Sequence, residues 1–248
     1  MLELMVVVAT IEARMTSKRL PGKVMAECMG ITMLERLVTR LRSVSNIDEI
    51  VIATTTNSED DILVELASNL GVRFFRGSED NVFDRVIQAA LFARADTVVE
   101  ITGDCPLLDP VLVEQMVEIF RFNSCDYLSN CESPSFPAGM EIQVVSLQAL
   151  VKSYQMTDSV LDREHVTLHI RKNPELFRQM HLIAPLGLRF PEFSVTLDES
   201  ADLEVIRAVI ENLEKSNPLF GCENIIHFLN QNQNIAKLNM NVTRKGDT

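Results

Sequence analysis

The chain has 248 residues, of which 46% are hydrophobic and 23% charged, and it carries a formal net charge of −12. This length can bury a large core, so we expect a single α/β domain with an added lobe. The acidic balance argues against nucleic-acid or membrane partners, and the first apolar run (residues 4–11) is too short to span a bilayer.

Strand and helix patterns alternate through the first half of the chain. Residues 4–11 form a continuous Val-rich run of the kind found in buried parallel strands. Ser58 is a candidate cap for the second helix, and Pro110 suits the first turn of the fourth. The expected strands are residues 4–11, 49–53, 72–75 and 97–101, and the expected helices are residues 33–41, 60–70, 82–94 and 110–120. This alternation predicts a doubly wound, mainly parallel sheet.

The alternation breaks in the second half. Residues 124–139 contain two prolines and little periodicity, which indicates a loop. The expected strands are then residues 141–145, 180–184 and 193–197, and the expected helices are residues 147–154, 163–171 and 202–213. A last helix runs into the Asn/Gln-rich residues 230–234, and we expect a mobile polar tail over residues 231–248.

Positive charge is concentrated near the start of this acidic chain. Residues 11–42 contain seven Arg or Lys against three Glu, a local net charge of +4. Arg36, Arg40 and Arg42 fall on the polar side of the first helix, and we assign them to a solvated face. The other cations lie in residues 14–23, where Pro21 prevents a helix. This loop follows the first strand, and its charge would attract small anions.

Several familiar motifs are absent. No Gly-x-Gly-x-x-Gly follows the first strand, and the Gly-Lys pair at residues 22–23 lacks the flanking residues of a Walker A loop. His165 and His169 are four residues apart but lack the glutamate of a zincin, so packing is the more common role for such a pair. The five cysteines form no Cys-x-x-Cys pair, so neither a zinc ribbon nor a disulfide framework is expected, and a reducing cytoplasm fits best.

Two carboxylates follow predicted strands. Asp104 comes just after residues 97–101 in the stretch "ITGDCPLLDP", where open α/β sheets bind ligands. Asp198 follows residues 193–197. Each residue has a plainer interpretation, a turn for Asp104 and helix capping by Asp198 or Ser200. Taken with the cationic loop, however, they indicate Mg²⁺ ligands beside a phosphate chain, the groups that attack on a nucleotide α-phosphate requires.

The opening stretch resembles the "ARxxSxRLPGK" signature of the CMP-KDO synthetase and acylneuraminate cytidylyltransferase superfamily, which activates sugar acids as CMP conjugates. The nearest branch is the one named for spore-coat polysaccharide biosynthesis protein F. The resemblance covers most of the chain, because further stretches follow in the same order: "IATTTN" from residue 52, "FRGSEDNVFDR" from 75, "ITGDCPLLDP" from 101, "REHVT" from 163 and "TLDESADLE" from 196.

The resemblance implies a nucleotide-diphospho-sugar-transferase-like fold, a GT-A or Rossmann-like three-layer sandwich, and a homodimer. It implies a nucleotide-binding part over about residues 1–122 and an acceptor and dimerisation part over about 123–230. By the same resemblance the triphosphate loop contains Arg14, Ser17, Arg19 and Lys23, and the Mg²⁺ site consists of Asp104 and Asp198. The residues around the cytidine would be Thr54, Thr55, Arg76 and Asp80. The residues of the acceptor site would be Glu141, Arg163, Glu164 and His165.

The expected reaction is a Mg²⁺-dependent transfer of CMP from CTP to a small-molecule acceptor, with release of pyrophosphate. Lys23 and Arg14 would neutralise the charge that grows during attack. Two alternatives remain: a glycosyltransferase that uses a nucleotide sugar, disfavoured because the chain has no Asp-x-Asp, and a non-catalytic nucleotide-binding subunit, which would not need both the cations and the carboxylates.

The chain departs from the branch at two places. The residues after the basic loop, 30–34, lack the usual lysine, and "GMEIQV" at residues 139–144 replaces the usual "GxDVEV". In the second change, Glu141 replaces the shorter aspartate of the branch, and the neutral Gln143 replaces its glutamate. Both changes bear on the identity of the acceptor.

Overall fold

A computed structural model of the chain describes residues 5–244. Leu4, where the first strand was expected to begin, and the last four residues of the expected tail lie outside this range. Among the described helices, none has the length and apolar content needed to cross a membrane. All five cysteines carry free thiols.

The centre of the molecule is a seven-stranded sheet in the order β5-β4-β1-β6-β8-β7-β9. β8 runs antiparallel to both of its neighbours, whereas the other pairings in this sheet are parallel, so the expectation of a mainly parallel sheet is confirmed. The strands are β1 (Val7–Glu12), β4 (Glu49–Thr55), β5 (Arg73–Gly77), β6 (Thr97–Thr102), β7 (Tyr127–Ser129), β8 (Gln143–Ser146) and β9 (Gln179–His181), with a separate hairpin of β2 (Glu27–Cys28) and β3 (Ile31–Thr32).

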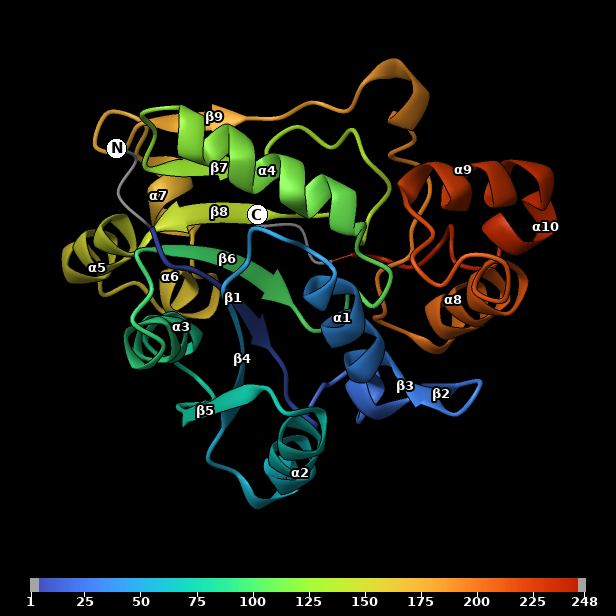
Figure 1. The fold of residues 1–248 in the computed structure, drawn as a ribbon, viewed down its shortest axis with the longest axis horizontal. Helices are drawn as coiled ribbons and strands as arrows, with labels where there is room; N and C mark the ends of the chain where they lie inside the picture. Colours follow the sequence, from blue (N-terminus) through green and yellow to red (C-terminus); the bar gives the residue numbers. More distant parts are fainter. Residues whose placement is uncertain (1–4, 245–248) are drawn as a thin grey trace.

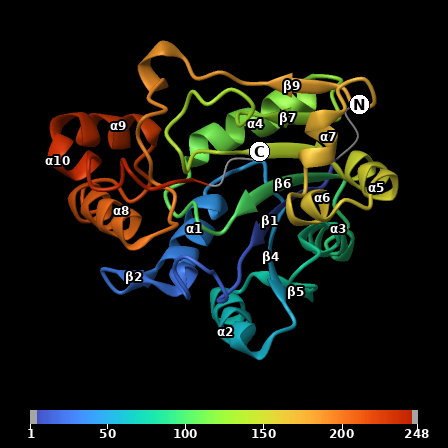
Figure 2. The same cartoon turned by 180° about the vertical axis from the view of Figure 1, so that it is seen from behind.

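Helices cover both faces of the sheet and complete a three-layer sandwich (Figure 1). The α-helices are α1 (Met33–Arg42), α2 (Asp61–Leu70), α3 (Val82–Phe92), α4 (Pro110–Phe122), α5 (Leu147–Met156), α6 (Val160–Glu164), α7 (Leu168–Lys172), α8 (Ser200–Leu213), α9 (Cys222–Gln231) and α10 (Gln233–Ala236); the 3₁₀ turns are η1 (Lys23–Met25), η2 (Ser58–Asp60) and η3 (Leu186–Leu188). One apolar core joins the sheet to α1, α2, α4, α8 and α9, and a second joins its other face to α3, α5 and α7. Figure 2 shows α3, α5, α6 and α7 on this second face, with α8 to α10 beyond the end of the sheet.

The order of the strands creates a crevice beside β1. β1 pairs with β4 on one side and with β6 on the other, so the chain winds outward from β1 in one direction and then returns to build the sheet in the opposite direction. The loops after β1 and β6 diverge at this switch point, where doubly wound sheets bind their ligands. The basic loop follows β1, and Asp104 follows β6.

Arg36 and Arg40 do not lie on a solvated face, so that expectation was wrong. Their exposed fractions are 4% and 2%, whereas Arg42 is exposed. Arg40 donates to the carbonyl of Leu108 at 2.8 Å and to that of Phe220, and burial lowers its pKa to about 10. Arg36 also pairs with Glu214 at the end of α8, so this side of α1 is covered by the C-terminal lobe, which comprises α8 to α10 and the loops between them.

Four local predictions also fail. The loop predicted over residues 124–139 contains the short strand β7, and the strand predicted over 193–197 forms only an isolated bridge between Ala138 and Ser194. The helix predicted over 163–171 is divided into α6 and α7, because His165 adopts an extended backbone. Ser58 begins η2 and does not cap α2, since Asp60 takes the N-cap position.

The described part of the expected tail packs against the lobe. Asn239 is 4% exposed and donates to Asp202 at 2.8 Å, and Arg244 donates to the same carboxylate at 2.8 Å. Asp202 is fully buried at the start of α8. Up to residue 244 the expected mobile tail is therefore anchored, and it borders the segment that carries Asp198.

Candidate active site

The basic loop between β1 and η1 is closed by its own backbone. Gly22 donates to the carbonyl of Met15 at 2.8 Å and has a φ of 71°, a left-handed conformation that glycine adopts without strain. Asp60 fixes the near end of the loop by accepting from the Met15 amide at 2.7 Å. The same carboxylate accepts from Thr55, at the end of β4. The loop is therefore tied to the strand beside it.

Lys23 ends this loop and lies between the two strand-end carboxylates. Its ammonium nitrogen is 2.8 Å from Asp104 Oδ2 and 2.9 Å from Asp198 Oδ1. Burial alone would lower the pKa of Lys23, but Asp104 and then Asp198 outweigh it and raise that pKa. Burial would likewise raise the pKa of Asp104, and the neighbouring Lys23 instead holds it below its usual value. Lys23 and Asp104 are thereby both kept charged.

The two carboxylates are also joined through the backbone. The amide of Leu197 donates to the carbonyl of Asp104 at 2.8 Å, so the segment before α8 runs beside the end of β6. Arg19 lies 2.7 Å from the same Asp198 oxygen that Lys23 contacts. This arrangement brings together residues that are far apart in the sequence.

Arg14 has a different partner within the same loop. Its guanidinium lies 3.2 Å from Glu79, which follows β5 and also accepts from Thr16 at 2.5 Å and Asn57 at 2.6 Å. The hydrogen bonds from Thr16 and Asn57, followed by the charge of Arg14, lower the pKa of Glu79. Glu79 therefore orients Arg14 while keeping it away from the carboxylate pair.

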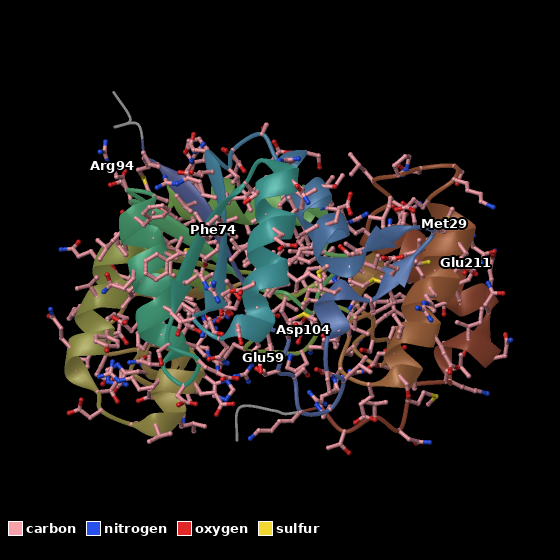
Figure 3. All side chains as sticks on the ribbon, turned by 90° about the horizontal axis from the view of Figure 1, so that it is seen from below. Met29, Glu59, Phe74, Arg94, Asp104 and Glu211 are labelled. Atoms are coloured by element: carbon pink, nitrogen blue, oxygen red, sulfur yellow. The ribbon has the colours of Figure 1, made fainter. Side chains whose placement is uncertain are left out.

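A cleft of about 310 Å³ opens at the carboxyl ends of β1 and β6. Its lining contains these predicted site residues: Arg14, Ser17, Arg19, Lys23, Asp104, Asp198, Glu164 and His165. The first four come from the basic loop, whereas Glu164 and His165 come from the end of α6. Figure 3 shows Asp104 in the middle of the molecule, well away from Glu211 on α8 and Met29 in the hairpin. The cleft thus combines the cations of the basic loop, the carboxylate pair and a side formed by the end of α6.

The residues predicted around the cytidine lie beside this cleft and do not line it. Thr54 and Thr55 are fully buried at the end of β4, and Asp80 is exposed. Arg76 donates at 2.7 Å to the carbonyls of Thr55 and Asn57 and pairs with Asp61 at 2.6 Å. Arg76 therefore stabilises the turn between β4 and α2, and the contacts with cytidine stay a prediction.

Two predicted acceptor residues also lie outside the cleft lining. Arg163 donates to the carbonyl of Thr157 at 2.7 Å and lies over the ring of Tyr154. Glu141 accepts from the amide of Gly139 at 2.5 Å and lines a small neighbouring hollow. Their contact with the acceptor stays a prediction as well.

Glu12 and Arg85 also line the cleft, although neither was among the site residues predicted from the sequence. Glu12 is the last residue of β1, so the rule that identified Asp104 at the end of β6 applies to it equally. Arg85 lies on α3 and is 2% exposed. No local pattern marks Arg85, because its position depends on the packing of α3 against the sheet.

Comparisons with known proteins agree with this geometry. A family model described as "Cytidylyltransferase" matches residues 8–235. Spore coat polysaccharide biosynthesis protein SpsF of Bacillus subtilis is 34% identical over 236 residues, covering 91% of this chain and 95% of that protein. The 3-deoxy-manno-octulosonate cytidylyltransferase of Syntrophotalea carbinolica is 36% identical over 175 residues, covering 68% and 63% of the two chains.

A solved structure extends the comparison to three dimensions. A cytidylyltransferase from Leptospira borgpetersenii superposes with a TM-score of 0.89 at 30% identity, covering 98% of this chain and all of that one. The family resemblance inferred from the short motifs is thereby confirmed, as are the fold class and the assignment as an enzyme. The chain belongs to the cytidylyltransferase family.

Proposed function

We propose that this protein uses CTP and Mg²⁺ to transfer CMP to a sugar acid or a related small acceptor, releasing pyrophosphate, in the biosynthesis of a surface polysaccharide. The names of the relatives, a spore-coat polysaccharide protein and an octulosonate cytidylyltransferase, support this choice of substrates and pathway. We further propose a cytoplasmic homodimer without nucleic-acid or membrane partners.

The observation that carries the proposal is the position of Lys23 between Asp104 and Asp198. A cation already lies between two carboxylates, whose hard oxygen atoms are the ligands that Mg²⁺ prefers. Asp104 and Asp198 would hold the ion, and the phosphate chain would supply further oxygen ligands. When bound, Mg²⁺ would offset the negative charge that builds up on the phosphates during transfer.

The cations of the loop would bind the triphosphate. Arg14, Ser17 and Arg19 line the cleft, and each can donate hydrogen bonds to phosphate oxygens. Lys23 would leave the carboxylates and follow the charge that develops on the departing pyrophosphate. The acceptor oxygen would attack the α-phosphorus in line from the side of Glu164 and His165, together with Glu141 and Arg163. Thr54, Thr55, Arg76 and Asp80 would surround the cytidine.

A pyrophosphate-release screen tests the proposal. Purified protein is incubated with Mg²⁺ and CTP against a panel of acceptors: octulosonate and nonulosonate sugar acids, neutral sugars, phosphonates and phosphate esters. We expect pyrophosphate release that requires both CTP and one class of acceptor. ATP, GTP and UTP in the same reactions are the controls, and release of pyrophosphate from all four nucleotides at equal rates would contradict the proposed specificity.

A further inference from the structure

A row of polar side chains crosses the sheet beneath the cleft. Strand register places Glu100 of β6 opposite Thr10 of β1 on one side and opposite Gln143 of β8 on the other, and Gln143 lies opposite Ser129 of β7. These side chains lie on the face that otherwise packs the apolar side chains of α3, α5 and α7. Burying polar groups there is unfavourable unless they are hydrogen-bonded, so the row needs a physical explanation.

Gln143 fixes the orientation of Glu100. Its amide nitrogen donates to Glu100 Oε2, and its amide oxygen accepts from Tyr127 and Thr167, each at 2.5 Å. Both hydroxyl groups donate to that oxygen, which leaves the amide nitrogen facing Glu100. Glu100 is 5% exposed and is held as an acceptor beside the end of β1.

Glu12 connects this row to the cleft. It lines the cleft and forms a side-chain hydrogen bond with Glu100. Two carboxyl groups can share a hydrogen bond only if one of them holds a proton. The other Glu12 oxygen, Oε1, is buried and has no hydrogen-bond partner within the described chain. The pair therefore has unused capacity to accept a proton next to the site of transfer.

The charged groups around Glu12 oppose one another. Burial, followed by Glu100, raises the pKa of Glu12 well above its usual value, and Asp104 adds to this effect. Arg85 of α3 opposes it. From α6, Glu164 and His165 line the same cleft, as does Arg14 of the basic loop.

We propose that Glu12 is the general base of the reaction, accepting the proton of the acceptor hydroxyl while Glu100 keeps the proton that already joins the two carboxyl groups. This inference rests on the proposed function and names a catalytic residue for it. The acceptor oxygen loses its proton to Glu12 and forms a bond to the α-phosphorus. The bond from that phosphorus to the bridging oxygen breaks, and its electron pair leaves with pyrophosphate. Arg85 holds the ionised Glu12 in place before the transfer.

The substitution Glu12→Gln tests the proposal, because it keeps the size and hydrogen bonding of the side chain but cannot accept the proton. With the acceptor on which the wild-type chain releases pyrophosphate, we expect the single-turnover rate at saturating CTP to fall about a hundredfold to ten-thousandfold. The affinity for CTP should stay near the wild-type value. Glu211→Gln, an exposed change on α8, is the matched control and should leave the rate unchanged.

The pH dependence distinguishes a base from a structural residue. The wild-type rate should rise with pH as the carboxyl pair ionises and then reach a plateau, and Glu12→Gln should lack this rise. Glu100→Gln removes a neighbour that raises the pKa of Glu12, so the reaction rate of this variant should rise at a lower pH than that of the wild type. This second variant leaves Glu12 in place and serves where Glu12→Gln folds poorly.

Two results would overturn the proposal. One is that the wild-type chain is active and that a folded Glu12→Gln variant has the same rate and the same pH profile. The other is a Glu100→Gln profile that coincides with that of the wild type. Either result would remove Glu12 from the chemistry while leaving the transfer of CMP established, because the wild-type release of pyrophosphate is measured independently.

Discussion

Lys23 Nζ lies 2.8 Å from Asp104 Oδ2, and this contact places the positive end of the basic loop directly at the carboxyl end of β6. Asp198 binds the same ammonium group from the segment before α8. Arg19 lies 2.7 Å from the same Asp198 oxygen, so two cations occupy the two carboxylates and balance their charge. A divalent cation that binds both carboxylates must therefore displace Lys23, which would then be free to bind the phosphates.

The first prediction concerns this displacement. Without nucleotide, the wild-type chain should bind Mn²⁺ weakly, because Lys23 competes for both carboxylates. Lys23→Met should tighten Mn²⁺ binding by about tenfold or more, the size of a typical coupling between two ligands. Electron paramagnetic resonance of free Mn²⁺ measures the affinity directly. Lys18→Met removes the same charge from an exposed position in the same loop and should have a smaller effect. Equal affinities in the Lys23→Met variant and the wild type would contradict the competition.

The second prediction concerns Asp104. Asp104→Asn preserves the shape of the side chain but removes the charge, and we expect turnover at saturating CTP to fall by about two to three orders of magnitude. Lys23 keeps its contact with Asp198, so the unfolding temperature should change by only a few degrees. Steady-state kinetics and calorimetry check the two statements. Near-normal turnover at saturating Mg²⁺ would be incompatible with a metal ligand at this position.

The third prediction concerns the nucleotide base. In the presence of Mg²⁺, CTP should raise the unfolding temperature, because a ligand that binds only the native state stabilises it. ATP and GTP should raise it much less. Thermal-shift measurements at equal nucleotide concentrations make the comparison. If all nucleotides protect the chain equally, the cleft binds only the phosphate chain.

The fourth prediction concerns stability and pH. The pKa of Glu12 is raised in the folded chain, so between the unfolded and folded pKa values the folded state binds more protons than the unfolded state. Stability is therefore lost as the pH rises through this range. Glu12→Gln should remove the loss and stabilise the chain at pH 8 by on the order of 1 kcal/mol, with little gain at pH 4.

Denaturant unfolding of both chains at the two pH values measures this difference. Asp84→Asn, a change in the first turn of α3, is a suitable control for general effects of losing a carboxylate. A Glu12→Gln variant that is less stable than the wild type at pH 8 would show that ionised Glu12 stabilises the fold through Arg85.

The sequence predicts those parts of the site that follow from strand ends. Lys23 and Asp104 could be identified because a loop or turn directly follows an apolar strand, and parallel strands bring such positions to one edge. Asp198 was identified in the same way, although its segment forms only an isolated bridge at Ser194. The extended segment ends where a strand would, which places Asp198 beside Asp104 and Lys23.

The remaining features depend on tertiary contacts that no local pattern contains. Arg40 lies on the polar side of α1, but the turn before α4 and the C-terminal lobe cover that side, and the carbonyls of Leu108 and Phe220 accept its hydrogen bonds. Glu79 orients Arg14 from a loop 65 positions away in the sequence. Arg85 reaches the cleft only because α3 packs on one particular face of the sheet. Periodicity identifies the helix faces but not the segments that cover them.

The measurement that tests the account most directly is ³¹P NMR of the protein with Mg²⁺, CTP and the acceptor selected by the screen. Attack on the α-phosphorus predicts one equivalent of pyrophosphate for each CMP conjugate formed, with loss of the three CTP signals together. Substituting Lys23 by Met should slow both product signals equally. Formation of CDP with inorganic phosphate or a phosphorylated acceptor would place the attack on the γ-phosphorus and contradict the proposed reaction.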